Sequence, residues 1–233
     1  MNEPFNKLSG VRELPLFPLP VVLFPGAPLP LHIFEPRYRE MLRDVQAGDQ
    51  TFGLSYFDAS ESTSDEPPVG HVGCAAEIVE AQDTPDGRAN IMTVGVARYT
   101  VESYVETDRM YLIGKVRFFE DMPEADSELD TLSAQVVELF MKIARAVRTI
   151  NNERAALPDL QTDDPERLSF LIAAAMEMDA EIKLGLLELR STGERLTRIR
   201  NMLKDVVQTY EERARVHKVA SGNGHGGKKV NLG

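Results

Sequence analysis

Tryptophan is absent from this 233-residue sequence, cysteine occurs once, and basic residues are fewer than acidic ones. The single cysteine, Cys74, excludes an intrachain disulfide framework and a zinc site built from several cysteines. It is typical of a reducing cytoplasm, and we expect it in the core. With 26 Lys and Arg against 37 Asp and Glu, the formal net charge of −11 repels phosphate backbones. We therefore expect no nucleic-acid partner.

A continuous apolar run able to cross a membrane is missing too. Residues 14–34 have the required length, but six prolines interrupt them, and a helix there would lose amide donors that hydrocarbon cannot replace. Glu3 and Glu13 lie in the leader, and no small-residue cleavage site follows, which argues against a signal peptide. The sequence therefore predicts a cytoplasmic protein without a membrane partner.

The patterns of known catalytic and metal sites are also lacking. The four histidines are not spaced as metal ligands, and His71 with Cys74 supplies only two ligands. No Gly-x-Ser-x-Gly nucleophile elbow occurs. Residues 222–228 have the spacing of a nucleotide-phosphate loop, but Lys229 stands where a magnesium-binding Ser or Thr is needed. We expect a protein that is not an enzyme, with no catalytic residue, metal ligand or cofactor.

The first half of the chain is predicted to be rich in strands. Short runs of β-branched and aromatic residues are separated by proline, glycine and acidic stretches, and residues 58–68 are expected to form a mobile loop. The expected strands are 13–16, 21–24, 29–34, 51–57, 69–81, 89–105 and 111–119. About six strands with one inserted helix are typical of a small, nearly closed barrel.

Turns and one helix are predicted between these strands. Pro25-Gly26 predicts a type II turn, and Asp86-Gly87 predicts a hairpin. Gly95, inside a strand pattern, indicates a bulge or a close approach by another backbone segment. Arg98 is expected to pair with a carboxylate or with carbonyl groups. A short helix is expected to begin at Pro36, to end at Gly48, and to have Tyr38, Met41, Leu42 and Val45 on one face.

The second half is predicted to be helical. Apolar residues recur at helical spacing over 132–150, and further helices are expected over 165–176, 179–189 and 191–210. Residues 121–130, with five acidic residues and no basic one, are expected to form a solvated connector. The chain thus divides into a β-rich unit at 1–122, a bundle of four helices at 123–218 and a disordered tail at 219–233.

The most distinctive motif is LPLFPLPVVLFPGAPLPLHIFEPRY at residues 14–38. It closely resembles the opening of the N-terminal, substrate-binding domain of Lon proteases. Further matches to the pattern of that family lie at 73–78, 91–98, 111–116 and 186–196, so the resemblance spans roughly residues 12–210. The ATPase and Ser-Lys peptidase modules of full Lon proteases have no counterpart here, and the chain is similar to a stand-alone Lon N-terminal domain protein.

The resemblance implies an α+β fold, in which a PUA-like β pseudo-barrel is followed by a C-terminal helical bundle. It also implies a non-catalytic module that binds unfolded or hydrophobic polypeptide segments, as an adaptor in protein quality control. Two other classes stay open: a PUA-like protein that binds RNA or a small ligand, and an enzyme with an unrecognised site. The 10 basic and 18 acidic residues of 1–120, a balance of −8, weigh against RNA. A separate protease or chaperone and a second copy of the chain stay open as partners.

The peptide-binding surface is expected at the proline-rich rim, with a groove between the barrel and the helices as the alternative. An exposed apolar rim strand could pair with an extended peptide through backbone hydrogen bonds. The candidate peptide-binding residues are Leu29, Leu31, His32, Phe34 and Arg37. Phe24, Ile33 and Phe34 are expected in the core rather than at a binding surface, so Phe34 is a candidate under both interpretations.

Overall fold

The computed structural model describes residues 8, 10, 12–58, 66–152 and 163–223, with side chains described to residue 218. The chain divides into two compact units. The first consists of Met1–Pro123 and Phe170–Ser191, and the second of Glu124–Ser169 and Thr192–Gly233. Within the described ranges, no helix combines the length and the apolar character needed to cross a membrane.

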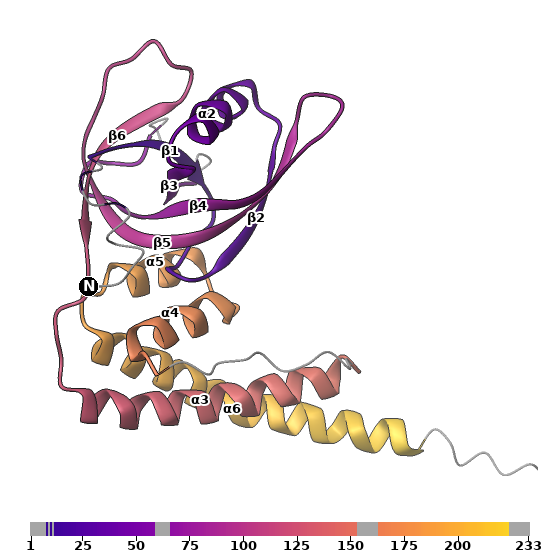
Figure 1. Ribbon diagram of the computed structural model, residues 1–233. Helices are drawn as coiled ribbons and strands as arrows, with labels where there is room; N and C mark the ends of the chain where they lie inside the picture. The colour runs from indigo at the N-terminus through magenta and orange to yellow at the C-terminus, as the bar shows by residue number, and fades with distance from the viewer. Residues whose placement is uncertain (1–7, 9, 11, 59–65, 153–162, 224–233) are drawn as a thin grey trace, which may run out of the picture. The chain divides into compact units, whose positions relative to one another are not determined.

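A six-stranded mixed sheet forms the centre of the first unit (Figure 1). Its strands are β1 (Glu13–Leu19), β2 (Pro28–Ile33), β3 (Thr51–Tyr56), β4 (Val72–Asp83), β5 (Ala89–Tyr104) and β6 (Leu112–Phe119). The helices of the chain are α2 (Pro36–Ala47), α3 (Asp126–Ile150), α4 (Pro165–Ala175), α5 (Ala180–Glu188) and α6 (Thr192–Asn223). The expected α+β fold is confirmed.

Strand β5 closes the sheet into a barrel because it pairs with three other strands. The strand order is β2-β5-β4-β3-β1-β6, and β6 pairs a second time with the later part of β5. Strands β5, β4, β3, β1 and β6 therefore form a closed ring, in which only β1 and β3 run parallel. Strand β2 lies outside this ring and pairs with the first part of β5.

Apolar side chains fill the interior of the barrel. The Tyr99 and Ser55 hydroxyls lie 2.8 Å apart inside it, in a buried hydrogen bond. A Cβ at Gly73 would come within 2.4 Å of the Tyr99 ring, so glycine makes room for this side chain. Cys74 is buried as expected, and burial raises the pKa of its thiol to about 12. The core cluster consists of Leu8, Leu14, Leu16, Ala75, Ala97, Tyr99, Val101 and Val116.

Gly95 allows the loop before β2 to cross β5 at close range. A Cβ at this position would lie 2.1 Å from the carbonyl oxygen of Phe24. The Gly26 N–H donates to the Gly95 carbonyl at 2.8 Å, and the Gly95 N–H donates to the Ala27 carbonyl at 3.0 Å. The register between β4 and β5 shifts here as well. The expected bulge and the expected close approach are both present.

The local turn and helix signals are confirmed. Gly26 has a φ of 77°, and the Ala27 N–H donates to the Phe24 carbonyl across the turn, as in a type II turn. Gly87 has a φ of 75° in the hairpin between β4 and β5. Helix α2 begins at Pro36 and is capped at Gly48, and the four residues expected on its apolar face are its buried residues.

Residues 21–24 do not form the predicted strand. Among the described residues no strand pairs with them, and only Pro25 makes an isolated bridge, to Gly95. Phe24 is nevertheless fully buried, with its ring centroid 6.1 Å from that of Phe170 in α4. These residues are apolar because part of the loop is buried by side-chain packing. A short apolar run in the sequence does not distinguish a buried loop from a buried strand.

Arg98 joins β5 to α5 and to the end of β6. Its buried guanidinium pairs with the Asp121 carboxylate and donates to the carbonyls of Leu187, at 3.0 Å, and Leu189. It also lies 4.6 Å and 5.0 Å from the ring centroids of Phe119 and Phe170. The expectation that Arg98 binds a carboxylate and carbonyls is confirmed. The prediction of a solvated connector is wrong at Asp121, because its carboxylate pairs with the buried Arg98 guanidinium and its side chain is only 4% exposed.

The sequence predicts that the four later helices form one bundle, whereas the structure divides them between the two units. Phe170–Ser191 packs with the strands instead. Tyr56 in β3 donates to the Glu181 carboxylate of α5 at 2.8 Å, and Figure 1 shows α2 and α5 on opposite sides of the strands. The boundary after Pro123 lies one residue from the expected one.

In the second unit, α3 packs along α6. Arg195 is fully buried there, and its Nε donates to the Ser169 hydroxyl at 2.7 Å. Helix α6 continues to Asn223, so the first five residues of the predicted tail are helical. The rest of that tail, 224–233, and positions 59–65 of the predicted loop lie outside the described residues.

Candidate functional site

Strand β2 has one partner strand and one open edge. Leu29, Leu31 and Ile33 pair with Thr93, Ile91 and Ala89 of β5. The Gly95 N–H donates to the Ala27 carbonyl, and in an antiparallel ladder the residues whose backbone faces the partner alternate. The backbone groups of Pro28, Pro30 and His32 are therefore directed away from β5. In the described part of the chain, no other strand pairs with this edge.

The open edge accepts hydrogen bonds but scarcely donates them. Pro28 and Pro30 have no N–H, so the outward-facing groups are three carbonyls and the single N–H of His32. Proline at such an edge is a common protection against pairing with another strand. A peptide that added to β2 as a fully paired strand would leave its own acceptors opposite the prolines. Recognition here must use side chains as well as backbone.

The candidate residues of β2 divide between its two faces. Leu29 and Leu31 are half-buried, on the side of the buried Ile33 and Thr93. His32 is exposed on the opposite side, since side chains alternate along a strand. The sequence-based hypothesis treated them as one rim, and the structure brings only part of that set together.

Phe34 and His32 form the exposed aromatic part of the candidate site. The expectation that Phe34 lies in the core is wrong: its side chain follows the exposed side of β2, is 56% exposed, and its ring stacks with that of His32 at a centroid distance of 5.9 Å. His32 Nδ1 lies within hydrogen-bond distance of Asn90 Oδ1, at 2.7 Å. An exposed phenylalanine that is held in place by a neighbouring ring is a suitable contact for apolar side chains.

Arg37 lies close by in α2 but is occupied by its neighbours. It pairs with Glu35 at 2.9 Å, and its guanidinium lies 4.5 Å from the centroid of the Tyr38 ring. Both members of the ion pair are exposed, so water screens the interaction. Arg37 therefore contributes a partly neutralised charge three residues after Phe34.

Other strands contribute residues that the sequence hypothesis missed. Pro30 pairs with Met92, which pairs with Glu80, and Pro28 pairs with Val94, which pairs with Glu77. Cross-strand partners share a face, so these six side chains lie beside one another on the outer side of β2, β5 and β4. The alternation over 89–94 shows which residues share a face, but only the register shows that they lie beside β2.

The alternative site, a groove between the barrel and the helices, is filled where the first unit brings them together. Phe24, Arg98 and Phe170 occupy that junction, and each is at most 2% exposed. The described residues also contain no group of three His, Cys, Asp or Glu side chains placed to hold a metal ion. The exposed surface around β2 is therefore the candidate site.

Comparison with known proteins identifies the family of the chain. The family model of the substrate-binding domain of ATP-dependent protease La (Lon) matches residues 13–205. The chain belongs to the Lon substrate-binding domain family. The resemblance noted in the sequence is thereby confirmed across both units.

Full-length relatives of this Lon substrate-binding domain are several times longer than the chain. It is 29% identical over 197 residues to the Lon protease of Solibacter usitatus (strain Ellin6076), covering 84% of the chain and 24% of that protein. With the Lon protease of Desulfosudis oleivorans it shares 24% identity over 208 residues, covering 86% of the chain and 25% of that protein. The chain thus spans about a quarter of the length of these relatives.

Two solved structures share the fold. A Lon N-terminal domain protein from Xanthomonas campestris has a TM-score of 0.59 at 22% identity, covering 81% of this chain and 97% of that one. The N-terminal domain of a Mycobacterium avium complex Lon protease has a TM-score of 0.65 at 17% identity, covering 83% and 99%. At these identities the likeness supports the fold alone.

Proposed function

We propose that this Lon substrate-binding domain binds unfolded or apolar polypeptide segments at the surface around β2. It acts without chemistry of its own, as a cytoplasmic adaptor in protein quality control. The observation that carries the proposal is β2, an edge strand with an exposed aromatic pair, in a chain of this family. An exposed apolar surface with polar groups around it is typical of a protein-binding site.

The residues around β2 suit a receptor for varied sequences. Phe34 supplies apolar contact area, and His32 and Arg37 supply polar groups at its border. Such a surface accepts varied apolar side chains, because the open edge of β2 offers a bound chain few hydrogen-bond donors that would fix one sequence. A separate protease or chaperone would then act on the bound chain.

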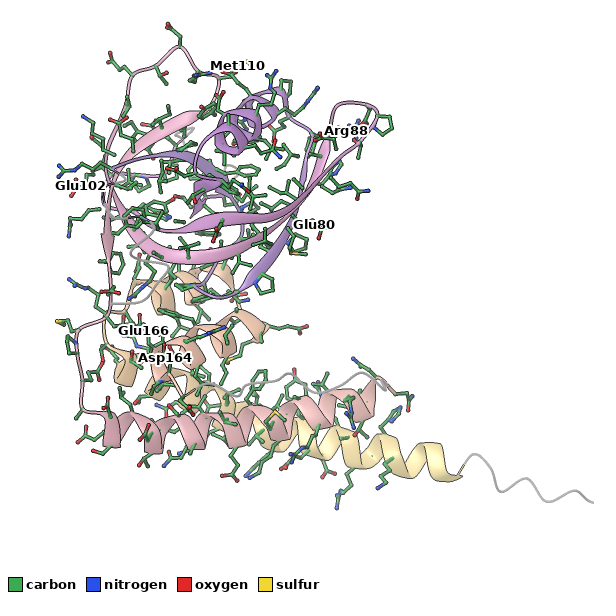
Figure 2. All side chains as sticks on the ribbon, viewed as in Figure 1. Glu80, Arg88, Glu102, Met110, Asp164 and Glu166 are labelled. Carbon is green, nitrogen blue, oxygen red and sulfur yellow. The ribbon has the colours of Figure 1, made fainter. Side chains whose placement is uncertain are left out.

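Anisotropy of a fluorescently labelled, reduced and alkylated protein chain tests this site. Phe34→Ala is expected to weaken binding about tenfold because it removes the exposed ring. His32→Ala and Arg37→Ala are each expected to weaken it about two- to fivefold. Met110→Ala is the matched control, since Met110 is 55% exposed in the loop between β5 and β6 (Figure 2).

Melting temperatures separate loss of binding from loss of folding. All four variants are expected to melt like the wild type, because the altered side chains lie outside the core. If the folded Phe34, His32 and Arg37 variants bind as tightly as the wild type, the surface around β2 is not the site. Sedimentation over a range of dilutions then shows whether a second copy of the chain covers it.

A further inference from the structure

The outer side of β2, β5 and β4 joins apolar and acidic side chains in adjacent rows. Pro30, Met92 and Glu80 form one row, and Pro28, Val94 and Glu77 form the next; we refer to these six residues as the wing face. Met92 and Val94 are half-exposed, and Glu80 is exposed. The wing face is therefore an apolar strip with carboxylates along one margin.

The strand segments around the wing face carry charges of one sign. Neither β2, nor residues 77–83, nor residues 89–94 contain a lysine or an arginine. The nearby cations Arg37 and Arg88 are engaged by Glu35 and Asp86, each at 2.9 Å, and the guanidinium of Arg39 lies at Gly87, at the far end of the β4–β5 hairpin. Within the described residues, Glu80 has no ion-pair partner. A bound segment therefore meets the exposed Glu80 carboxylate with no lysine or arginine on the strand segments around it.

The open backbone edge of β2 has the same preference. Its carbonyls at Pro28, Pro30 and His32 accept hydrogen bonds, and only His32 offers an N–H in return. Both the edge and the wing face thus favour a partner that donates hydrogen bonds and carries positive charge. Lysine and arginine side chains do both, while their methylene stems pack on apolar surface.

We propose that the wing face selects extended polypeptide segments in which apolar residues alternate with lysine or arginine, and disfavours acidic segments. This inference rests on the proposed function and specifies its substrate class. Apolar side chains contact Met92 and Val94, and basic side chains reach Glu80 and the acceptor edge of β2. Because Glu80 is exposed, each ion pair contributes modestly and weakens in high salt.

Two labelled peptides of equal length and equal apolar content, one carrying lysines and the other glutamates, test the inference. In anisotropy titrations at low salt the lysine peptide is expected to bind about tenfold more tightly. Glu80→Gln is expected to weaken binding of the lysine peptide about two- to fivefold, and high salt to remove most of the difference. Glu102→Gln is the control, because Glu102 lies on the opposite flank of the strands and pairs with Arg117 (Figure 2).

The outcomes separate the two proposals. If both peptides bind equally and Glu80→Gln changes nothing, the preference for basic segments is wrong while the binding function stands. If neither peptide nor the unfolded model chain binds, both proposals fail. A dimer that Glu80→Lys dissociates, in a protein that binds no peptide, would assign the wing face to a second copy of the chain.

Discussion

Arg98 is a buried cation whose partners come from three other segments of the first unit. The Asp121 carboxylate balances its charge, and the carbonyls at the end of α5, which lack helical partners, accept its N–H groups. The rings of Phe119 and Phe170 lie near its guanidinium. A buried charge needs such complete pairing, since an unpaired one is strongly unfavourable.

Replacing Arg98 is therefore expected to be costly. Arg98→Met leaves the Asp121 carboxylate buried beside an apolar side chain and is expected to lower the free energy of unfolding by about 3–5 kcal/mol. Arg117→Met, which breaks an exposed pair with Glu102, is expected to change it by less than about 1 kcal/mol. Urea titration measures both. Equal effects of the two substitutions would contradict the role given to Arg98.

His71 makes stability depend on pH in a predictable direction. Burial lowers the pKa of His71 from its ordinary value of 6.5, and a hydrogen bond to the backbone of Tyr56 opposes this effect. Its Nε2 is buried without a hydrogen-bond partner in the described structure. A proton on this ring is thus less favourable in the folded than in the unfolded chain.

As the pH falls below about 6.5, the unfolded state binds this proton before the folded state does, so stability should decrease. Above that value both states are neutral at His71 and the contribution is constant. His71→Gln removes the titrating ring, and the decrease between neutral and mildly acidic pH is expected to become smaller. Urea midpoints of both proteins over this range provide the check; parallel pH curves would refute it.

At the scale of elements, the crossing of the loop before β2 over β5 depends on one missing side chain. Gly95→Ala would place a methyl group 2.1 Å from the Phe24 carbonyl oxygen. Relieving this contact must displace the loop or β5, so we expect a loss of about 2–3 kcal/mol. Thermal or urea unfolding gives the value.

Gly185→Ala is the matched control for this substitution. A Cβ at Gly185, inside α5, meets no atom within 4 Å. Alanine in a helix interior is expected to stabilise the protein there by about 0.5–1 kcal/mol. The same chemical change should thus have opposite signs at the two positions. A stable Gly95→Ala protein would show that the loop does not need the close approach.

The elements that the sequence predicted well are those set by local chemistry. Proline at the start of α2, Gly26 and Gly87 at positive φ, and the apolar face of α2 all depend on residues within one or two turns of each other. Asp164 likewise caps α4, as its Oδ1 accepts from the Glu166 N–H at 2.9 Å. Such signals need no knowledge of distant contacts.

The features that the sequence predicted poorly depend on contacts between residues far apart in the chain. The contacts of Arg98 with Leu187 and Leu189 join positions 89 and 91 residues apart, and these hold α5 within the first unit. Nothing local to 170–191 distinguishes a helix packed on a sheet from one packed in a bundle. At the candidate site, alternation along β2 already separates Leu29 and Leu31 from His32, whereas the neighbours Met92 and Glu80 follow only from the register.

For the whole molecule, the central claim is that a Lon substrate-binding domain receives polypeptide segments at the open side of β2. The ring of β5, β4, β3, β1 and β6 is closed, since β5 pairs with β6 and β6 with β1. In the described chain β2 has an open edge along its whole length, and the part of β4 after Ile78 pairs with β5 alone. The net charge of −11 adds a general attraction for basic segments, which salt should weaken.

Photo-crosslinking from single positions tests that claim most directly. A benzophenone side chain placed at Phe34, and in a second protein at Met110, is irradiated with a labelled unfolded chain, and the adducts are located by mass spectrometry. Both positions are more than half exposed, so exposure alone does not distinguish them. The account predicts abundant adducts from position 34 and few from position 110. Equal yields from the two positions, or adducts from position 34 only to a second copy of the protein, would contradict it.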